Sequence, residues 1–103
     1  MHVLDLGCGR DGRSTTDFAP RSWSIVGLDR LDPRLVTHRH PGFTYVRGDV
    51  RDLSPFDDEA FDLVISVGLL EHVTEPADFA HVAREIQRVA PQHGVIVPYS
   101  TGV

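Results

Sequence analysis

A short apolar segment that ends in glycines is the feature that most constrains the fold of this 103-residue chain. Residues His2–Leu6 are mostly apolar and predict a buried strand. Three glycines follow at Gly7, Gly9 and Gly12. Because glycine adopts positive φ and has no Cβ, such a loop can turn sharply and approach a ligand closely. A strand, a glycine loop and a helical segment in this order are typical of the first unit of a parallel α/β sheet.

Four further apolar runs predict strands. The run 61–67 is apolar apart from Asp62 and Ser66, which suits a central parallel strand buried on both faces. The last run contains Pro98, which cannot donate a ladder hydrogen bond, so we expect that strand to end there or to lie at an edge. The four predicted strands are 23–28, Phe43–Arg47, 61–67 and 95–99.

Helical segments separate these strands. The strongest has apolar residues at helical spacing from Phe79 to Ala90, with Pro76 in its first turn. Two shorter segments are expected at 14–18, with Ser14 as the N-cap, and at 33–38, beginning after Asp32. Strands that alternate with helical segments predict βαβ units, right-handed crossovers and one parallel sheet.

Composition narrows the class of protein. The hydrophobic share of 41% and the charged share of 24% are ordinary for one globular domain spanning residues 1–103. A net charge of -5 without a basic cluster argues against nucleic acid as a partner. No apolar run approaches the ~18 residues that span a bilayer, and no membrane partner is expected. Cys8 is the single cysteine, so no intrachain disulfide can form, and a cytoplasmic location is expected.

Ligands of parallel sheets bind at the carboxyl ends of the strands. Here that rule indicates the glycine loop, residues 48–49 and residues 66–69. The three loop glycines fit the G-x-G-x-x-G pattern, which leaves an NAD-binding module and a loop without any ligand as alternatives. Two acids also lie at strand ends. Asp29 follows the loop by about 20 residues, where a carboxylate can accept both hydroxyls of a ribose, and Asp49 follows the next strand. Asp5, inside the first strand, would need a partner if buried.

Five segments, taken in order, resemble the class I S-adenosylmethionine-dependent methyltransferases, particularly the small-molecule type. VLDLGCG resembles their first motif, and VGLD resembles the strand whose acid holds the ribose. GDVRDLSPF is similar to the segment whose acid meets the adenine amino group. FDLVISVGLLEHV resembles their fourth strand and the helix after it, and RVAPQHGVIV resembles the approach to the fifth. The likeness runs from Val3 to about Tyr99.

The resemblance implies a fold and a set of cofactor contacts. The fold is an α/β Rossmann-like three-layer sandwich with a parallel five-stranded sheet in the order 3-2-1-4-5. The reaction is methyl transfer from S-adenosyl-L-methionine to a small-molecule acceptor, without a metal. Backbone groups of the loop are expected at the methionine portion, Asp29 and Arg30 at the ribose, Asp49 and Val50 at adenine, and residues 66–68 beside the methyl group. The expected cofactor-binding residues are Asp5, Gly7, Cys8, Gly9, Asp29, Arg30, Asp49, Val50, Ser66, Val67 and Gly68.

The sequence departs from the family pattern at several points. Asp11 stands where the third loop glycine usually lies, and His93 replaces a later glycine. The segment 66–69 reads SVGL, not the Asn-Pro-Pro-Tyr of enzymes that methylate nucleobase or glutamine amino groups. The family adds N-terminal helices and two C-terminal strands, one of them antiparallel, outside the segment matched here. We therefore expect a fragment, a minimal homologue or a chain completed by a partner, with a non-catalytic module acting through the edge of the fifth strand as the alternative function.

Other candidate residues have simpler interpretations. His72 could act as a general base, although Glu71-His72 also fits a packing role at a helix start. Cys8 is expected to be structural because no His-Asp pair accompanies it. His38 and His40 are expected to be solvated, since no further Cys/His set completes a metal site.

Overall fold

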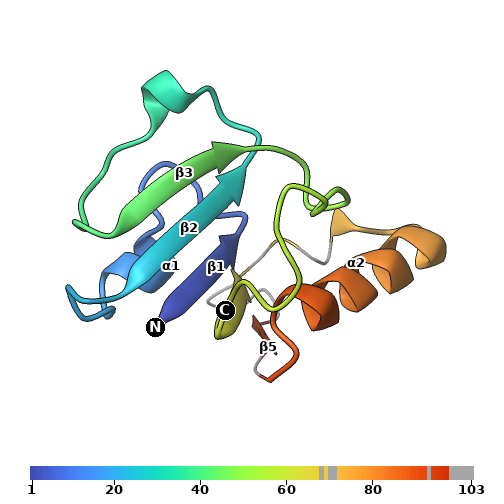
Figure 1. Cartoon of the computed structure of the whole chain (residues 1–103). Coiled ribbons are helices and arrows are strands. Elements are labelled where there is room, and N and C mark those ends of the chain that lie inside the picture. Colours follow the sequence, from blue (N-terminus) through green and yellow to red (C-terminus); the bar gives the residue numbers. More distant parts are fainter. Residues whose placement is uncertain (68, 70–71, 93, 98–103) are drawn as a thin grey trace.

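A parallel sheet forms the centre of the computed structural model, which describes residues 1–67, 69, 72–92 and 94–97. Its strands lie in the order β3-β2-β1-β4-β5, and each neighbouring pair is parallel (Figure 1). The α/β Rossmann-like class and the strand order 3-2-1-4 expected from the sequence are confirmed. The strands are β1 (His2–Leu6), β2 (Ser24–Asp29), β3 (Phe43–Arg47), β4 (Leu63–Val67) and β5 (Gly94–Val97).

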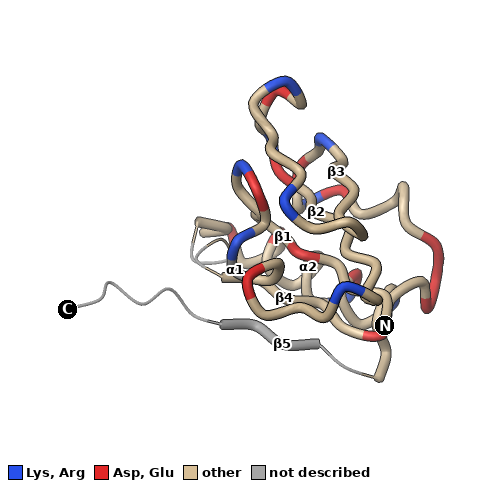
Figure 2. Tube along the Cα trace, turned by 90° about the vertical axis from the view of Figure 1, so that its left-hand side faces the viewer, with Lys and Arg blue, Asp and Glu red and all other residues tan. Residues whose placement is uncertain are grey.

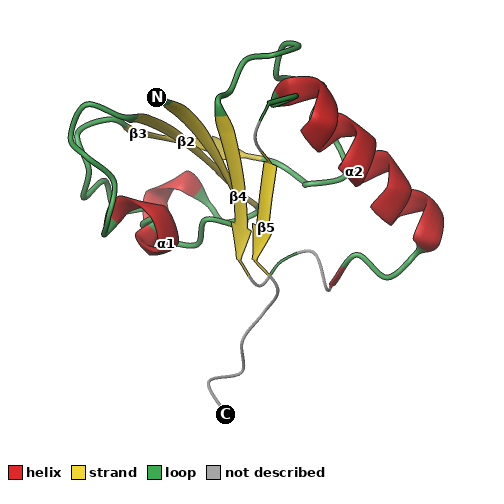
Figure 3. Ribbon diagram, turned by 90° about the horizontal axis from the view of Figure 1, so that it is seen from below, coloured by secondary structure: helices red, strands yellow, loops and turns green. Residues whose placement is uncertain are grey.

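Two helices cover opposite faces of this sheet. Helix α1 (Arg13–Thr16) lies on one side and helix α2 (Pro76–Val89) on the other (Figure 3). Side chains alternate along each strand. On β1, Leu4 and Leu6 join the apolar cluster beneath α2, and Val3 belongs to the smaller cluster on the α1 side. The two clusters make the core of a three-layer arrangement.

Helix α2 confirms the strongest helix prediction. Val82, Ile86 and Val89 recur at i, i+4 and i+7 and are all buried. Pro76 occupies the first turn, where its missing N–H costs nothing, and the helix ends before Ala90. Burying each such aliphatic side chain contributes roughly 1.5–3 kcal/mol, so this face anchors the helix to the sheet.

The boundaries of two helical segments differ from the expected ones, because single backbone conformations set where each begins or ends. The first helix is shorter than 14–18, and its N-cap is Gly12 at φ 61, not Ser14. The segment predicted at 33–38 is a 3-10 helix, η1 (Pro33–Leu35), because the chain turns extended at Val36. Its expected start is confirmed, since the Asp32 carboxylate accepts from the N–H of Arg34 at 2.9 Å. Pro98 and Tyr99 of the last predicted strand lie outside the described residues.

One histidine expected to be solvated is buried instead. His40 is 6% exposed, and Gly42 N–H donates to its Nδ1 at 2.9 Å. Its Nε2 lies 2.9 Å from the carbonyl oxygen of Pro20, so the ring connects two loops through its two nitrogen atoms. His38 is exposed, as expected. Within the described part of the chain, no helix is long and apolar enough to cross a membrane.

Candidate functional site

The carboxyl ends of β1 to β4 and the segments that follow them surround a cavity of about 320 Å³. This volume lies at the lower end of the range for pockets that bind small molecules, about 300–1,000 Å³. Most charged residues lie in loops and helices around the sheet rather than within its strands (Figure 2). The cavity is lined by Gly7, Leu28, Asp29, Arg30, Gly48, Asp49, Val50, Arg51, Leu69, His72, Val73, Thr74 and Glu75.

The glycine loop begins at Gly7, the loop residue that lines the cavity. Gly7 adopts φ 74, and a Cβ there would lie 3.0 Å from the Cβ of Leu69. Both the position and the conformation therefore favour glycine. The N–H groups of Gly7 and Cys8 donate to the carbonyl of Leu28 at 2.8 and 3.2 Å, which holds the loop against the end of β2.

Asp29 ends β2 and connects two parts of the site. Its Oδ2 accepts from the N–H of Gly9 at 2.8 Å, and its Oδ1 accepts from the N–H of Arg30 at 2.6 Å. The carboxylate is thereby fixed between the glycine loop and the cavity. A carboxylate oxygen can accept more than one hydrogen bond, so both oxygens keep the capacity to bind ligand hydroxyls.

Asp49 follows β3 and is held by an arginine that sequence reasoning missed. The backbone N–H of Arg51 donates to Oδ1 at 2.9 Å, and its guanidinium donates to Oδ2 at 2.8 Å. These Arg51 hydrogen bonds lower the pKa of Asp49 to about 2. Arg51 also lies 3.8 Å from Asp78 in the first turn of α2. The Asp-Val-Arg spacing, which suits a local side-chain-to-backbone turn, was the signal available in the sequence.

Asp5 is buried beneath the loop and does not line the cavity. Its Oδ2 accepts from the hydroxyl of Thr15 at 3.0 Å, which supplies the partner that burial demands. Burial raises the pKa of this carboxyl to about 7, and the charge of Asp29 adds to the rise. The hydrogen bond between Asp5 and Thr15 therefore connects β1 to α1, the helix that follows the glycine loop.

Cys8 turns its side chain into the core. It is 8% exposed and packs in the cluster that contains Ile25 and Phe43. Burial raises the pKa of the thiol to about 12, which keeps the sulfur protonated and a poor nucleophile at neutral pH. A buried, protonated thiol agrees with the structural role expected from the sequence.

The other expected contacts divide into three groups. Gly7, Asp29, Arg30, Asp49 and Val50 line the cavity, as does the candidate base His72. Four residues expected at the cofactor, in addition to Asp5, are not among its lining residues, and Gly68 lies outside the described residues. Those four are Cys8, Gly9, Ser66 and Val67.

Ser66 is 1% exposed and does not line the cavity. It lies on β4 beside Leu6 of β1 in the sheet register, so its side chain is buried on the α2 face. Its hydroxyl is buried and has no hydrogen-bond partner among the described residues. Within the same part of the chain, no group of three His, Cys, Asp or Glu side chains could hold a metal ion.

Comparison with known proteins places this geometry in a family. Residues 4–97 match the family described as methyltransferase domain. The phthiotriol/phenolphthiotriol dimycocerosates methyltransferase of Mycobacterium tuberculosis is 40% identical over 70 residues, which are 63% of this chain and 26% of that protein. A protein of Encephalitozoon cuniculi named as a methyltransferase is 38% identical over 101 residues, covering 97% of this chain and 45% of its own length. The chain thus spans less than half of these relatives.

Solved structures agree with this result. A S-adenosylmethionine-dependent methyltransferase of Methanosarcina mazei superposes with a TM-score of 0.70 at 25% identity, covering 86% of this chain and 47% of that one. A TehB-like S-adenosylmethionine-dependent methyltransferase of Corynebacterium glutamicum gives a TM-score of 0.70 at 27% identity, covering 92% and 53%. The chain belongs to the class I S-adenosylmethionine-dependent methyltransferases, and S-adenosylmethionine is the cofactor that this membership implies.

Proposed function

We propose that this chain forms the cofactor-binding core of an enzyme that transfers a methyl group to a small-molecule acceptor. The observation that carries the proposal is the position of Asp29. Its carboxylate is fixed by the glycine loop on one side and borders the cavity on the other. A fixed acceptor at the end of β2 suits the two hydroxyls of a ribose.

The lining of the cavity fits the rest of the cofactor. Leu28, Val50 and Leu69 contribute apolar surface against which a planar base can lie. Asp49 is an ionised acceptor for an exocyclic amino group, and Arg51 orients it. Gly7 leaves open the space that a Cβ would fill next to Leu69. These residues would hold the adenosine portion of the cofactor between the ends of β1, β2 and β3.

The methyl group carried on the sulfonium of S-adenosylmethionine supplies the electrophile of the reaction. The chain's own contribution is therefore orientation of the two reactants and exclusion of water. His72, Thr74 and Glu75 line the cavity from the connection between β4 and α2. Histidine exchanges protons readily near neutral pH, so His72 is the residue we assign to accept a proton from the acceptor.

The acceptor is proposed only as a class. One relative is named for dimycocerosates and a structural neighbour, at 27% identity, is named for arsenic(III). Both acceptors are small compared with a protein or a nucleic acid, although they share little chemistry. This supports a small-molecule acceptor for the present chain and leaves its identity to a direct screen of acceptors.

Cofactor binding can be tested at Asp29. Replacing one carboxylate oxygen in Asp29→Asn removes a charged acceptor, so the affinity for S-adenosylhomocysteine should fall roughly 10–150-fold by calorimetry. Asp57→Asn, a change at an exposed aspartate outside the cavity lining, should bind as the wild type does. Equal affinity of Asp29→Asn and wild type would overturn the assignment. NAD, tested at the same concentration, should leave the melting temperature unchanged.

A second function, action through a partner chain, is favoured by the position of β5. Among the described residues β5 pairs with β4 alone and forms one end of the sheet. An exposed edge strand offers N–H and C=O groups to another chain. Solution mass measured alongside methyl-transfer activity separates the two proposals. An active monomer supports the enzyme, whereas an inactive chain that binds S-adenosylhomocysteine only as an oligomer supports the partner-dependent module.

A further inference from the structure

We propose that Arg30, Arg47 and Gly48 form a binding site for a phosphate group next to the cofactor cavity. These three residues, which we call the arginine notch, line a second cavity of about 300 Å³. The notch adjoins the cofactor cavity, because Arg30 and Gly48 line both. Its ligand is a phosphate monoester or inorganic phosphate, bound independently of methyl transfer.

Within the described residues, Arg47 forms no ion pair with Asp29, its neighbour on the adjacent strand. In the register of β2 and β3 it lies beside Asp29. The Asp29 carboxylate accepts instead from the backbone N–H groups of Gly9 and Arg30. Within the described residues, neither Arg30 nor Arg47 forms an ion pair. Two exposed guanidiniums therefore keep their donors available for a ligand.

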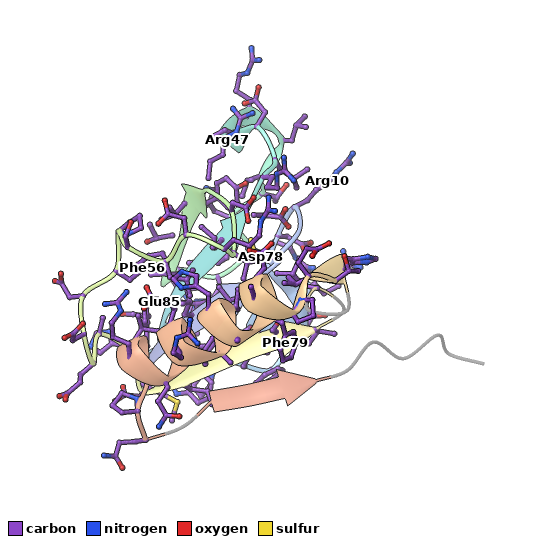
Figure 4. The ribbon with its side chains drawn as sticks, turned by 90° about the vertical axis from the view of Figure 1, so that its right-hand side faces the viewer. Arg10, Arg47, Phe56, Asp78, Phe79 and Glu85 are labelled. Atoms are coloured by element: carbon purple, nitrogen blue, oxygen red, sulfur yellow. The ribbon has the colours of Figure 1, made fainter. Side chains whose placement is uncertain are left out.

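The carboxylates near the notch are already occupied by other arginines. Asp32 pairs with Arg34 at 2.7 Å, and Asp49 pairs with Arg51 at 2.8 Å. Each acid is affected most by its own arginine partner, although Arg47 also lowers the pKa of Asp32 and Arg30 also lowers the pKa of Asp49. The four arginines outnumber these two acids and Asp29, which leaves an excess of positive charge at the notch on a chain whose formal net charge is -5. Figure 4 shows Arg47 above the labelled acids Asp78 and Glu85 of α2 in that view.

Gly48 gives the notch a fixed floor. Its N–H donates to the carbonyl of Asp29 at 2.8 Å, which ties the end of β3 to the end of β2. A Cβ at this position would lie 2.9 Å from Cδ1 of Leu28, so a side chain would disturb the packing there. The two arginines consequently extend from adjacent strand ends that are held together. Arginine forks bind the oxygens of phosphate in pairs, which lysine does not.

Titration with inorganic phosphate, followed by calorimetry and by ³¹P line width, tests the site on the chain saturated with S-adenosylhomocysteine. Arg47→Gln should weaken phosphate binding about tenfold, because one charged donor pair is lost. The phosphate affinity of Arg47→Lys should lie between that of the wild type and that of Arg47→Gln. The control Arg21→Gln removes an exposed arginine from another loop and should bind phosphate as the wild type does. Affinity for S-adenosylhomocysteine should stay within about twofold in every variant.

Adenosine monophosphate distinguishes the two sources of the phosphate. Adenosine monophosphate that bridges both cavities should bind more tightly than inorganic phosphate. Its binding should also depend on Arg47 and be displaced by S-adenosylhomocysteine. Binding no tighter than that of inorganic phosphate, and still dependent on Arg47, indicates a free phosphate. Absence of saturable phosphate binding to the wild type, or equal weakening in Arg21→Gln and Arg47→Gln, would overturn the site. Neither of these results affects the test at Asp29.

Discussion

The two faces of the sheet are covered very differently. A 14-residue helix, α2, covers one face, whereas α1, with 4 residues, lies on the other. The α2 face is filled by large apolar side chains such as Leu53 and Ile86. The α1 face includes the buried pair of Asp5 and Thr15 beneath the glycine loop. We infer that stability comes mainly from the α2 face, while the thinner α1 face supports the ligand-binding loop at a cost in stability.

The largest effect is expected in the core beneath α2. Ile86 is 6% exposed and packs in the larger cluster, so Ile86→Ala should lower the free energy of unfolding by about 2–5 kcal/mol. Urea denaturation measures this loss. Because Ile86 does not line the cavity, the affinity of the folded chain for S-adenosylhomocysteine should not change.

Phe79 supplies the matched control on the same helix. It is 45% exposed, so truncation to Ala should cost far less than truncation of Ile86. Equal losses at both positions would contradict the division between a packed face of α2 and a solvent-facing one. A change in ligand affinity that exceeds the loss of folded protein in Ile86→Ala would contradict the separation of stability from binding.

The buried Asp5 on the α1 face should make the free energy of unfolding depend on pH. The pKa of Asp5 rises from 3.8 to about 7 because the carboxyl is buried, so between these pH values the folded chain holds a proton that the unfolded chain has lost. Stability from this group is therefore complete below about pH 4 and falls as the pH rises to about 7. The total loss is at most about 4 kcal/mol.

Asp5→Asn removes the titrating group and keeps an oxygen that can accept from Thr15. Its free energy of unfolding should exceed that of the wild type at pH 8, and the difference should shrink toward pH 4. Urea denaturation at several pH values measures it, with Asp57→Asn as a control that follows the wild-type curve. Parallel curves for wild type and Asp5→Asn would show that the carboxyl is not under strain in the folded chain.

Much of the fold could be predicted because its signals are local. The apolar run of β1 and the spacing of Val82, Ile86 and Val89 report burial directly. The ends of elements were less predictable, since they depend on single backbone conformations. Gly12 at φ 61 begins α1 earlier than a serine cap would, and Val36 ends η1 by turning extended.

The site was predictable where the rule on strand ends applied. Asp29 and Asp49 follow β2 and β3 and border the cavity for that reason. Arg51 and Thr15 were missed because their roles depend on contacts with particular side chains. His40 was misassigned because burial against Pro20, distant in sequence, leaves no local pattern.

The smallest effect is expected at Arg51, the partner of Asp49. The pKa of Asp49 is lowered, whereas the pKa of Asp5 is raised. Its pair with Asp49 is partly exposed, so Arg51→Gln should cost no more than about 1 kcal/mol of stability. The pKa of Asp49 is lowered to about 2 by Arg51, so its contribution is present above pH 3.8 and disappears as the pH falls through about 2. Urea denaturation should therefore separate Arg51→Gln from wild type at pH 6 and not near pH 2, with Arg84→Gln as the exposed control. Asp5 and Asp49 would then change stability in opposite directions with pH. Asp5 does so because it is buried, and Asp49 because Arg51 holds it at the edge of the cavity. A loss of stability in Arg51→Gln that persists near pH 2 would contradict the assignment of this loss to the pair of Arg51 with ionised Asp49.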